Sequence, residues 1–391
     1  MFFAKSINLR TAKTLFSLRN FRTNACLRSA LSDSPNAQLD RTLFDRYMDL
    51  PVPECKIQAC YVWIDGTGIN LRCKSRTLDF IPSSYKEVPQ WSFDGSSTGQ
   101  GVVRNSDCYL VPVAMYKDPI LRGNDKLVLC ETYDLNQKPT MSNHRQKCVE
   151  AVSKACEYEM KFGFEQEFIY VGSDRRPFGW PVNGEPGKDV LSYCGVGGNN
   201  VVGRAILEAF YRCCLYCDIE IYGTNAEVMP SQWEFQTGPT LNMKAGDDLW
   251  MARFLLAKVA EDFGVGISYE PKPYPHLNGS GMHVNFSTNK MREEGGLKYI
   301  EEAVEKLSKT HKEHIAVYDL SGGEENKKRL TGRNETSHID KFTSGVGDRS
   351  ASVRISLLVS RNKKGFLEDR RPAANADPYQ IINVLVKSII L

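Results

Sequence analysis

Apolar and polar positions alternate with two different periods along the chain. Between residues 55 and 135, short runs such as KIQACYVWIDG and KLVLCETYDL show the alternation of strands with one buried face. From about residue 141, helical and strand patterns follow one another, beginning with SNHRQKCVEAVSKACEYEMKFG, whose apolar residues recur at helical spacing. The pattern predicts an α+β protein with a small β-rich domain over residues 34–140 and a larger domain over residues 141–391.

Two further segments are predicted to be helices, one at each end of this pattern. Residues 35–50 (PNAQLDRTLFDRYMDL) are helix-like, and IINVLVKSIIL at the C-terminus is typical of a packed helix. This last segment is apolar over only 11 residues and is interrupted by Asn383 and Lys387, whereas a bilayer requires about 20 apolar residues. We therefore expect no membrane partner.

The first 32 residues carry a strong positive bias. They hold six Lys or Arg and no acid, and without them the formal charge changes from +3 to −3. A segment rich in Arg, Ser and apolar residues and poor in acids is typical of a mitochondrial transit peptide. Residues 1–33 are thus predicted to be removed on import into the matrix, with a cytoplasmic location as the alternative. The slightly acidic remainder argues against a nucleic-acid partner, which would favour a basic face.

Twelve cysteines are scattered through the chain, which favours reduced thiols over a disulfide framework. Cys214 and Cys217 form a C-x-x-C pair, but they lie inside the helical run RAILEAFYRCCLYC without a second pair at zinc-binding spacing. Core packing is the expected role of both.

A predicted hairpin raises the first question of chemistry. The stretch TNAEVMPSQWEFQTGP predicts a tight turn at Pro230 and Ser231, which would place Glu227 directly opposite Glu234. Like charges that face each other across two strands destabilise a sheet. A cation is therefore expected between them.

Other polar residues share strand faces in the same half of the chain. In FGFEQEFIYV, period-two alternation puts Glu165 and Glu167 on one face, and in HLNGSGMHVNFST it does the same for His283 and Asn285. GFLEDRRPAANADP adds Glu368. Each feature taken alone is common in solvated strands and loops, but together they form a set of five carboxylates and one imidazole.

Such a donor set suits Mg²⁺ or Mn²⁺ better than zinc or copper. Paired divalent ions commonly bind polyphosphates, so a nucleotide substrate is indicated, although the pattern GxxxxGK[ST] does not occur. Arg329, Arg349 and Arg354 lie in a run of small polar residues. Since arginine binds phosphate and carboxylate with two parallel hydrogen bonds, these side chains are candidates for holding the substrate.

Seven motifs resemble those of the eukaryotic-type glutamine synthetases, in the same order and spacing: WSFDGSSTGQ, FGFEQEF, NAEVMPSQWEFQTGP, NGSGMHVNFST, RLTGRNETS, DRSASVR and FLEDRRPAANADP. The resemblance extends from about Asp40 to the end of the chain. It implies a β-grasp-like N-terminal domain and a catalytic domain with an antiparallel sheet and flanking helices, as in guanido kinases. It also implies a homo-oligomer of stacked rings, ten subunits in the eukaryotic type, whose sites are shared between subunits.

The resemblance also implies a role for individual residues. Two or three Mg²⁺ or Mn²⁺ ions would occupy each site, with Glu165, His283 and Glu368 binding one and Glu167, Glu227 and Glu234 a second. ATP would contact Glu165, Glu234, Asn285, Phe286, Ser287, Arg349, Arg354, Phe366, Leu367 and Glu368. Glutamate and ammonium would contact Ser97, Asp107, Tyr193, Asn278, Gly279, Arg329, Arg349 and Arg370.

The implied reaction joins ammonia to L-glutamate with consumption of ATP, through γ-glutamyl phosphate. Asp94 would bind ammonium and remove its proton, Arg349 would stabilise the transferring phosphoryl group, and Glu335 would belong to a loop that closes the site. Two alternatives remain from the residues alone: a catalytically silent relative with the same fold, and a phosphagen kinase.

Overall fold

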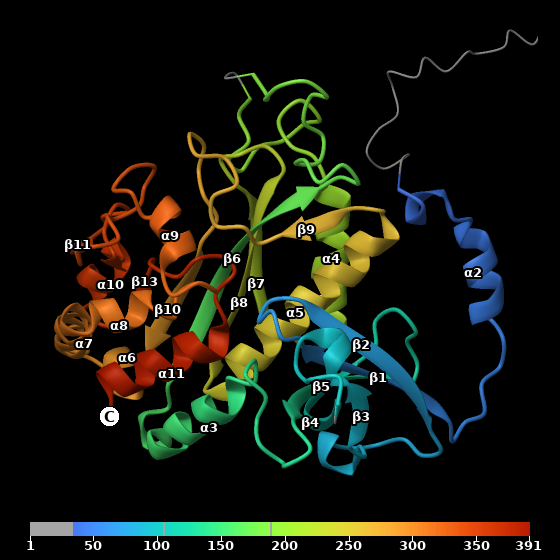
Figure 1. The fold of residues 1–391 in the computed structure, drawn as a ribbon. Helices are drawn as coiled ribbons and strands as arrows, with labels where there is room; N and C mark the ends of the chain where they lie inside the picture. The colour runs from blue at the N-terminus through green and yellow to red at the C-terminus, as the bar shows by residue number, and fades with distance from the viewer. Residues whose placement is uncertain (1–33, 105, 188–189) are drawn as a thin grey trace, which may run out of the picture.

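Two β-sheets and the helices packed on them form the described part of the chain, residues 34–104, 106–187 and 190–391, in the computed structural model (Figure 1). The predicted transit peptide, residues 1–33, lies outside the described residues. The α+β class is confirmed. None of the helices within these ranges is long and apolar enough to cross a membrane.

The smaller sheet has five strands in the order β2-β1-β5-β4-β3. They are β1 (Ile57–Ile64), β2 (Leu71–Leu78), β3 (Trp91–Asp94), β4 (Asp107–Lys117) and β5 (Lys126–Tyr133). β1 and β5 are parallel, and the other neighbours are antiparallel. Alternate residues of β1 are buried in different clusters: Tyr61 and Trp63 pack within the small sheet's own cluster, whereas Val62 and Ile64 join the main core.

Short helical elements precede and connect these strands: η2 (Asn36–Gln38), α2 (Arg41–Met48), η3 (Tyr85–Glu87) and η4 (Gly95–Thr98). α2 lies within the predicted helical segment, and it begins where the carboxylate of Asp40 accepts a hydrogen bond from the backbone N–H of Thr42.

The larger sheet follows the order β11-β12-β13-β10-β6-β8-β7, with β9 also paired to β6. Its strands are β6 (Lys161–Val171), β7 (Ile221–Ala226), β8 (Gln232–Leu241), β9 (Gly266–Ser268), β10 (Met282–Ser287), β11 (Ser344–Val346), β12 (Val353–Ile355) and β13 (Leu367–Asp369). All neighbours are antiparallel except β11 and β12. This agrees with the antiparallel catalytic sheet that the resemblance implied.

Helices precede, connect and follow the strands of this sheet. They are α3 (Arg145–Lys154), η5 (Cys156–Tyr158), α4 (Arg204–Tyr216), α5 (Met243–Asp262), α6 (Asn289–Arg292), α7 (Leu297–Lys309), α8 (His311–Ile315), α9 (Glu324–Arg329), α10 (Leu357–Asn362) and α11 (Pro378–Ile389). α11 confirms the predicted C-terminal helix: Asp377 caps it and Pro378 occupies its first turn. Figure 1 shows α5 between the two sheets.

Polar contacts join the small sheet to the helices of the larger part. The hydroxyl of Tyr116 on β4 donates to Asp248 of α5 at 3.0 Å. Arg145 at the start of α3 binds Glu131 of β5 at 2.9 Å and Asp247 of α5 at 2.8 Å. These groups are largely buried, and the apolar core runs without a break from β1 to α5.

The predicted hairpin forms, but its register differs from the prediction. Asn225, not Glu227, lies opposite Glu234, and Glu227 donates its backbone N–H to the carbonyl of Gln232 at 2.9 Å. A two-residue hairpin turn needs a positive φ at its first central residue, which Pro230 cannot adopt. The chain instead forms a four-residue loop, with Ser231 at φ 74°. The two-residue shift leaves Glu227 diagonal to Glu234 on the same face.

The described cysteines are free thiols, as predicted. Cys214 and Cys217 are buried in the main core, which confirms packing as their role.

Candidate active site

Strand alternation sorts the side chains of the large sheet onto two faces. Phe164 and Phe168 of β6 and Trp233 and Phe235 of β8 belong to the apolar core. The residues that alternate with them, Glu165, Glu167 and Glu234, therefore point to the opposite face. That face collects the six predicted metal ligands from five segments. Their ligand atoms form two triads, each with all atoms within 4.8 Å of one another: Glu165, His283 and Glu368; Glu167, Glu227 and Glu234.

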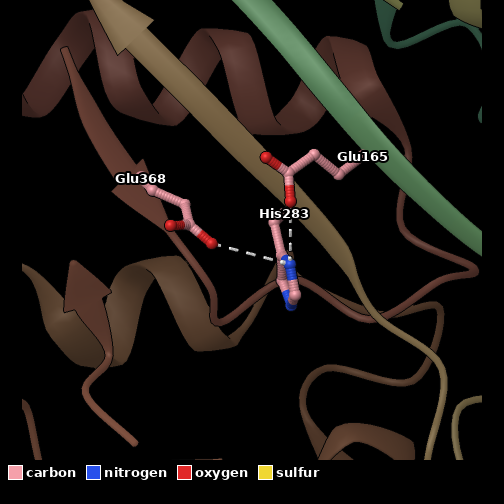
Figure 2. Close-up of side chains that lie close together, drawn as sticks. All are labelled: Glu165, His283 and Glu368. Atoms are coloured by element: carbon pink, nitrogen blue, oxygen red, sulfur yellow. Dashed lines mark hydrogen bonds and ion pairs between the residues drawn. The ribbon is translucent and has the colours of Figure 1, made fainter. Parts of the chain in front are cut away.

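The first triad lies across β6, β10 and β13. Figure 2 shows the carboxylates of Glu165 and Glu368 directed toward the same side of the His283 imidazole. Its Nδ1 is 3.3 Å from Glu165 Oε2 and 3.8 Å from Glu368 Oε1. Glu368 also accepts hydrogen bonds from Arg354 at 2.7 Å and Arg370 at 2.6 Å, one at each carboxylate oxygen.

Burial, together with the positive charge of Arg370, holds the pKa of His283 well below its usual range. The ring is therefore neutral near pH 7 and offers one nitrogen lone pair, which is the form in which histidine binds a metal ion. Two carboxylates beside a neutral imidazole form a set of ligands that suits a divalent cation.

The second triad brings three like-charged carboxylates together. Glu167 and Glu234 are direct partners across β6 and β8, and Glu227 lies diagonal to Glu234. No lysine or arginine among the described residues lies within ion-pairing distance of these three carboxylates. The cation expected from the sequence is thus not supplied by a side chain.

Ionisation of this triad is costly in the metal-free protein. Burial, assisted by the negative charge of Glu227, raises the pKa of Glu167 to about 8. Burial also raises the pKa of Glu227, and it raises that of Glu234 well above its usual value with help from the charge of Glu165. Three carboxylates, two of them buried and Glu227 partly buried, repel each other and direct hard oxygen donors to one point, which fits a divalent ion such as Mg²⁺ or Mn²⁺.

Three side-chain amides hold these acids in position, and sequence analysis missed all three. Gln236 donates to Glu234 at 2.5 Å, Asn225 to Glu227 at 2.9 Å, and Gln232 to Glu167 at 3.3 Å. A signal was present, because Gln232 and Gln236 stand two residues before and after Glu234 in one strand and so share its face.

Two cavities open on this face. The first, called here the Phe366 cavity, has a volume of about 450 Å³ and is lined by Gly163, Tyr222, Ser287 and Phe366, among others. The second, the acidic cavity, has a volume of about 520 Å³ and holds both triads. Four residues line both cavities and form their common wall: Glu165, Gln236, Arg354 and Glu368.

Most predicted substrate-binding residues line one of the two cavities. Asn285, Ser287 and Phe366 line the Phe366 cavity. The acidic cavity is lined by Tyr193, Asn278, Gly279, Arg329, Glu335, Arg349 and Arg370. Tyr222, which sequence analysis did not select, also borders the Phe366 cavity and is largely exposed.

Phe286 and Leu367 are predicted to contact ATP, but their side chains line neither cavity. They are partners across β10 and β13, and both side chains are completely buried in the core. The alternation that directs Asn285 and Glu368 into the site directs these two neighbours away from it. Any contact of theirs with a ligand is limited to the backbone.

Three predicted residues lie away from both cavities. Asp94 and Asp107 are partners on β3 and β4 of the small sheet, and Ser97 follows in η4. Neither cavity includes any of them. Hydrogen bonds from the hydroxyls of Ser97 and Ser96 hold the pKa of Asp94 far below its usual range, so this exposed carboxylate is ionised and attracts cations.

Comparison with known proteins identifies the family. The model of the glutamine synthetase catalytic domain matches residues 143–318. The chain is 53% identical over 362 residues to "Glutamine synthetase 2 cytoplasmic" of Drosophila melanogaster, which covers 92% of this chain and 98% of the relative. Glutamine synthetases of Panulirus argus (54%, covering 91% and 99%) and Homo sapiens (52%, covering 92% and 97%) are similarly close. The chain belongs to the glutamine synthetase family.

The region that matches the glutamine synthetase catalytic domain contains most of the clustered ligands. Residues 143–318 include five of the six clustered ligands, and Glu368 follows on β13. The identification made from seven motifs is therefore confirmed by relatives that align along nearly their whole length.

Proposed function

We propose that the two cavities of this glutamine synthetase separate its substrates, with ATP in the Phe366 cavity and L-glutamate in the acidic cavity. The overall reaction, ATP-dependent synthesis of glutamine, follows from membership of the family. The observation that supports this proposal is the common wall of the two cavities, because the γ-phosphate of ATP and the γ-carboxylate of glutamate would meet there. Its guanidinium group, Arg354, faces both cavities.

Divalent ions bound at the two triads, Mg²⁺ or Mn²⁺, would screen the phosphate charge and stabilise the phosphoryl group during transfer. Arg349 and Arg370 line the acidic cavity, where they can bind the carboxylates of glutamate and the transferring group. Arg329, whose pKa burial lowers to about 10, remains charged near pH 7. It contacts His283 at 3.3 Å, and its charge acts on Glu167 from beyond ion-pairing distance. The glutamate γ-oxygen then attacks the γ-phosphorus of ATP, the bond from this phosphorus to the bridging oxygen breaks, and γ-glutamyl phosphate and ADP are formed.

The second step requires ammonia, because ammonium has no lone pair. Asp94 is ionised and can attract ammonium, but its low pKa makes it a weak base in the isolated chain. Since Asp94 lines neither cavity of its own chain, we propose that it acts at the site of a neighbouring subunit within a ring, where the buried acids change its surroundings.

Glu335 lies in a loop over the acidic cavity. Asn334 and Glu335 both have positive φ, and Asn334 donates to the carbonyl of Leu277 at 3.4 Å. We propose that this loop, residues 331–337, excludes water from the acyl phosphate. The proposed domains are residues 34–140 and 141–391, and import into mitochondria is proposed from the composition of residues 1–33.

The test is an assay with purified protein, ATP, Mg²⁺, glutamate and hydroxylamine, which replaces ammonia as the nucleophile. Formation of γ-glutamyl hydroxamate is expected. ADP release only with a guanidino substrate would indicate a phosphagen kinase, and no ADP release with either acceptor would indicate a silent relative. Substitution of Arg354 by Met should abolish hydroxamate formation, whereas the same change at the exposed Arg361 of α10 should leave it intact.

A further inference from the structure

Two cysteines are close neighbours on the small sheet and line neither of the two cavities. Cys60 is on the central strand β1 and Cys73 on β2, which stands at the end of the sheet. In the register of these strands Val62 faces Cys73 and Ser75 faces Cys60, so the two thiols are diagonal neighbours on one face. The thiols are hydrogen-bonded to each other. Cys60 is buried, and Cys73 is exposed.

We propose that Cys60 and Cys73 form a reactive thiol pair that peroxides oxidise to a disulfide, with Cys73 as the attacking and Cys60 as the resolving thiol. No part of the glutamine-forming reaction uses either residue, so the inference stands apart from the proposed function.

The surroundings of the pair assign these two roles. The hydrogen bond from Cys60 and, to a smaller extent, the positive charge of Lys258 on α5 lower the pKa of Cys73 to about 7 against the opposing effect of burial. The same hydrogen bond raises the pKa of Cys60, as does its burial. Glu261, which pairs with Lys258 at 2.8 Å, and Asp118 are the nearby acids. A substantial part of Cys73 is thus thiolate near pH 7, and the thiolate is the nucleophile.

The other described thiols lack this combination. Burial raises the pKa of Cys130, Cys148, Cys214 and Cys217, which keeps them protonated near neutral pH. Burial also raises the pKa of Cys108 and Cys213. Cys55, Cys156 and Cys194 are exposed, and within the described ranges none of the three is hydrogen-bonded to another thiol. Oxidation is therefore expected to select one pair.

The chemistry balances with hydrogen peroxide as the oxidant. The Cys73 thiolate attacks one peroxide oxygen, the O–O bond breaks, and hydroxide leaves and becomes water, which gives a sulfenic acid on Cys73. The Cys60 sulfur then attacks the Cys73 sulfur, the S–O bond breaks, and the proton of Cys60 converts the departing hydroxide to a second water. Two thiols lose two electrons in total, and the peroxide accepts both.

Formation of the disulfide between Cys60 and Cys73 requires the edge strand β2 to move. Diagonal neighbours on two strands have Cα atoms about 7–8 Å apart, whereas a disulfide requires about 4.4–6.8 Å. β2 pairs with β1 alone among the described strands, so it can shift inward without breaking a second ladder. A bond formed under this constraint should be reduced readily by a small thiol such as glutathione.

The experiment treats the full chain, in parallel samples, with a small excess of hydrogen peroxide at pH 7.5, blocks free thiols, and maps peptides by mass spectrometry. A Cys60–Cys73 linked peptide is expected, and it should disappear after incubation with reduced glutathione. In the Cys60→Ser variant a dimedone adduct should accumulate on Cys73, at a rate at least about tenfold above that of Cys156. In Cys73→Ser, Cys60 should stay reduced.

Two outcomes would overturn the proposal. One is labelling of Cys73 in Cys60→Ser no faster than labelling of Cys156. The other is an oxidised wild type in which Cys73 is linked to cysteines other than Cys60 or carries only sulfinic acid. The hydroxamate activity of reduced Cys60→Ser and Cys73→Ser should equal that of the wild type, so failure here leaves the proposed function untouched.

Discussion

Neutralising Glu167 should make the metal-free protein much less sensitive to alkaline pH. The carboxyl of Glu167 has a pKa of 4.5 when unperturbed and about 8 in the folded, metal-free chain. A folded-state pKa above the unfolded one means that the folded state holds its proton longer. The contribution of Glu167 to stability is therefore fully present below pH 4.5 and is lost as the pH rises toward 8.

The expected size of this effect follows from the two pKa values. For a single group that shifts from 4.5 to about 8, linkage gives a loss of about 3.5 kcal/mol between pH 5 and pH 8. Glu167→Gln removes that loss. Relief of the repulsion on Glu234, its direct partner across the sheet, acts in the same direction.

The assay is urea unfolding followed by tryptophan fluorescence, in EDTA, at pH 5 and pH 8 and at one protein concentration. Comparing the two pH values within each variant cancels the cost of the altered hydrogen bonds from Gly281 and Gln232. Glu302→Gln, at an exposed glutamate of α7, is the matched control and should behave as the wild type. Saturating Mg²⁺ should restore most of the wild-type loss at pH 8 and little in Glu167→Gln.

The reasoning fails if the wild type and Glu167→Gln lose the same stability between pH 5 and pH 8, to within about 1 kcal/mol. It also fails if Glu302→Gln reproduces the effect. Either result would mean that the buried triad is not under electrostatic strain when metal is absent.

Three further outcomes are expected. Glu234→Ala should abolish ATP-dependent hydroxamate formation, because a ligand of the second triad is lost. Urea unfolding of this variant in EDTA should show equal or higher stability than the wild type at pH 8. Retention of most activity in Mg²⁺ would contradict the metal assignment. Asp94→Ala and Glu165→Ala should each be inactive, but co-expression should restore activity at about one interface in four; mixed particles that stay inactive would refute a shared site. Mass spectrometry of the organelle protein should find the chain without its first 25 to 35 residues, and an intact Met1 there would exclude import with cleavage.

Sequence patterns predicted the faces of strands better than their partners. Period-two alternation placed Glu165 with Glu167 and His283 with Asn285, and the structure agrees. The pairing of Glu227 with Glu234 was wrong because it depended on the turn, where Pro230 forbids the backbone angles of a two-residue loop. The direct partner of Glu234 across β6 is Glu167, and no local pattern could reveal a neighbour 67 residues away.

The sequence motifs alone did not predict which side chains line the two cavities. Phe286 and Leu367 were grouped with the ligand-binding residues as parts of a motif, yet their side chains are in the core. The common wall of the two cavities could not be predicted, because its members come from β6, β8, β12 and β13 and meet only in the folded sheet. The resemblance to the glutamine synthetases identified the site residues, and the folded structure shows which of them lie close together.

The buried links between the small sheet and helix α5 restrict how the enzyme can move. Opening a hinge between residues 57–133 and the catalytic sheet would expose the ion pairs of Arg145 and the hydrogen bond from Tyr116 to Asp248, together with a continuous apolar layer. We therefore expect substrate entry and product release to use loop motions, such as the one proposed for residues 331–337. Amide hydrogen exchange should be slow on both sides of α5 during turnover, and the small sheet should carry Asp94 as a rigid body whose position is set by assembly rather than by catalysis.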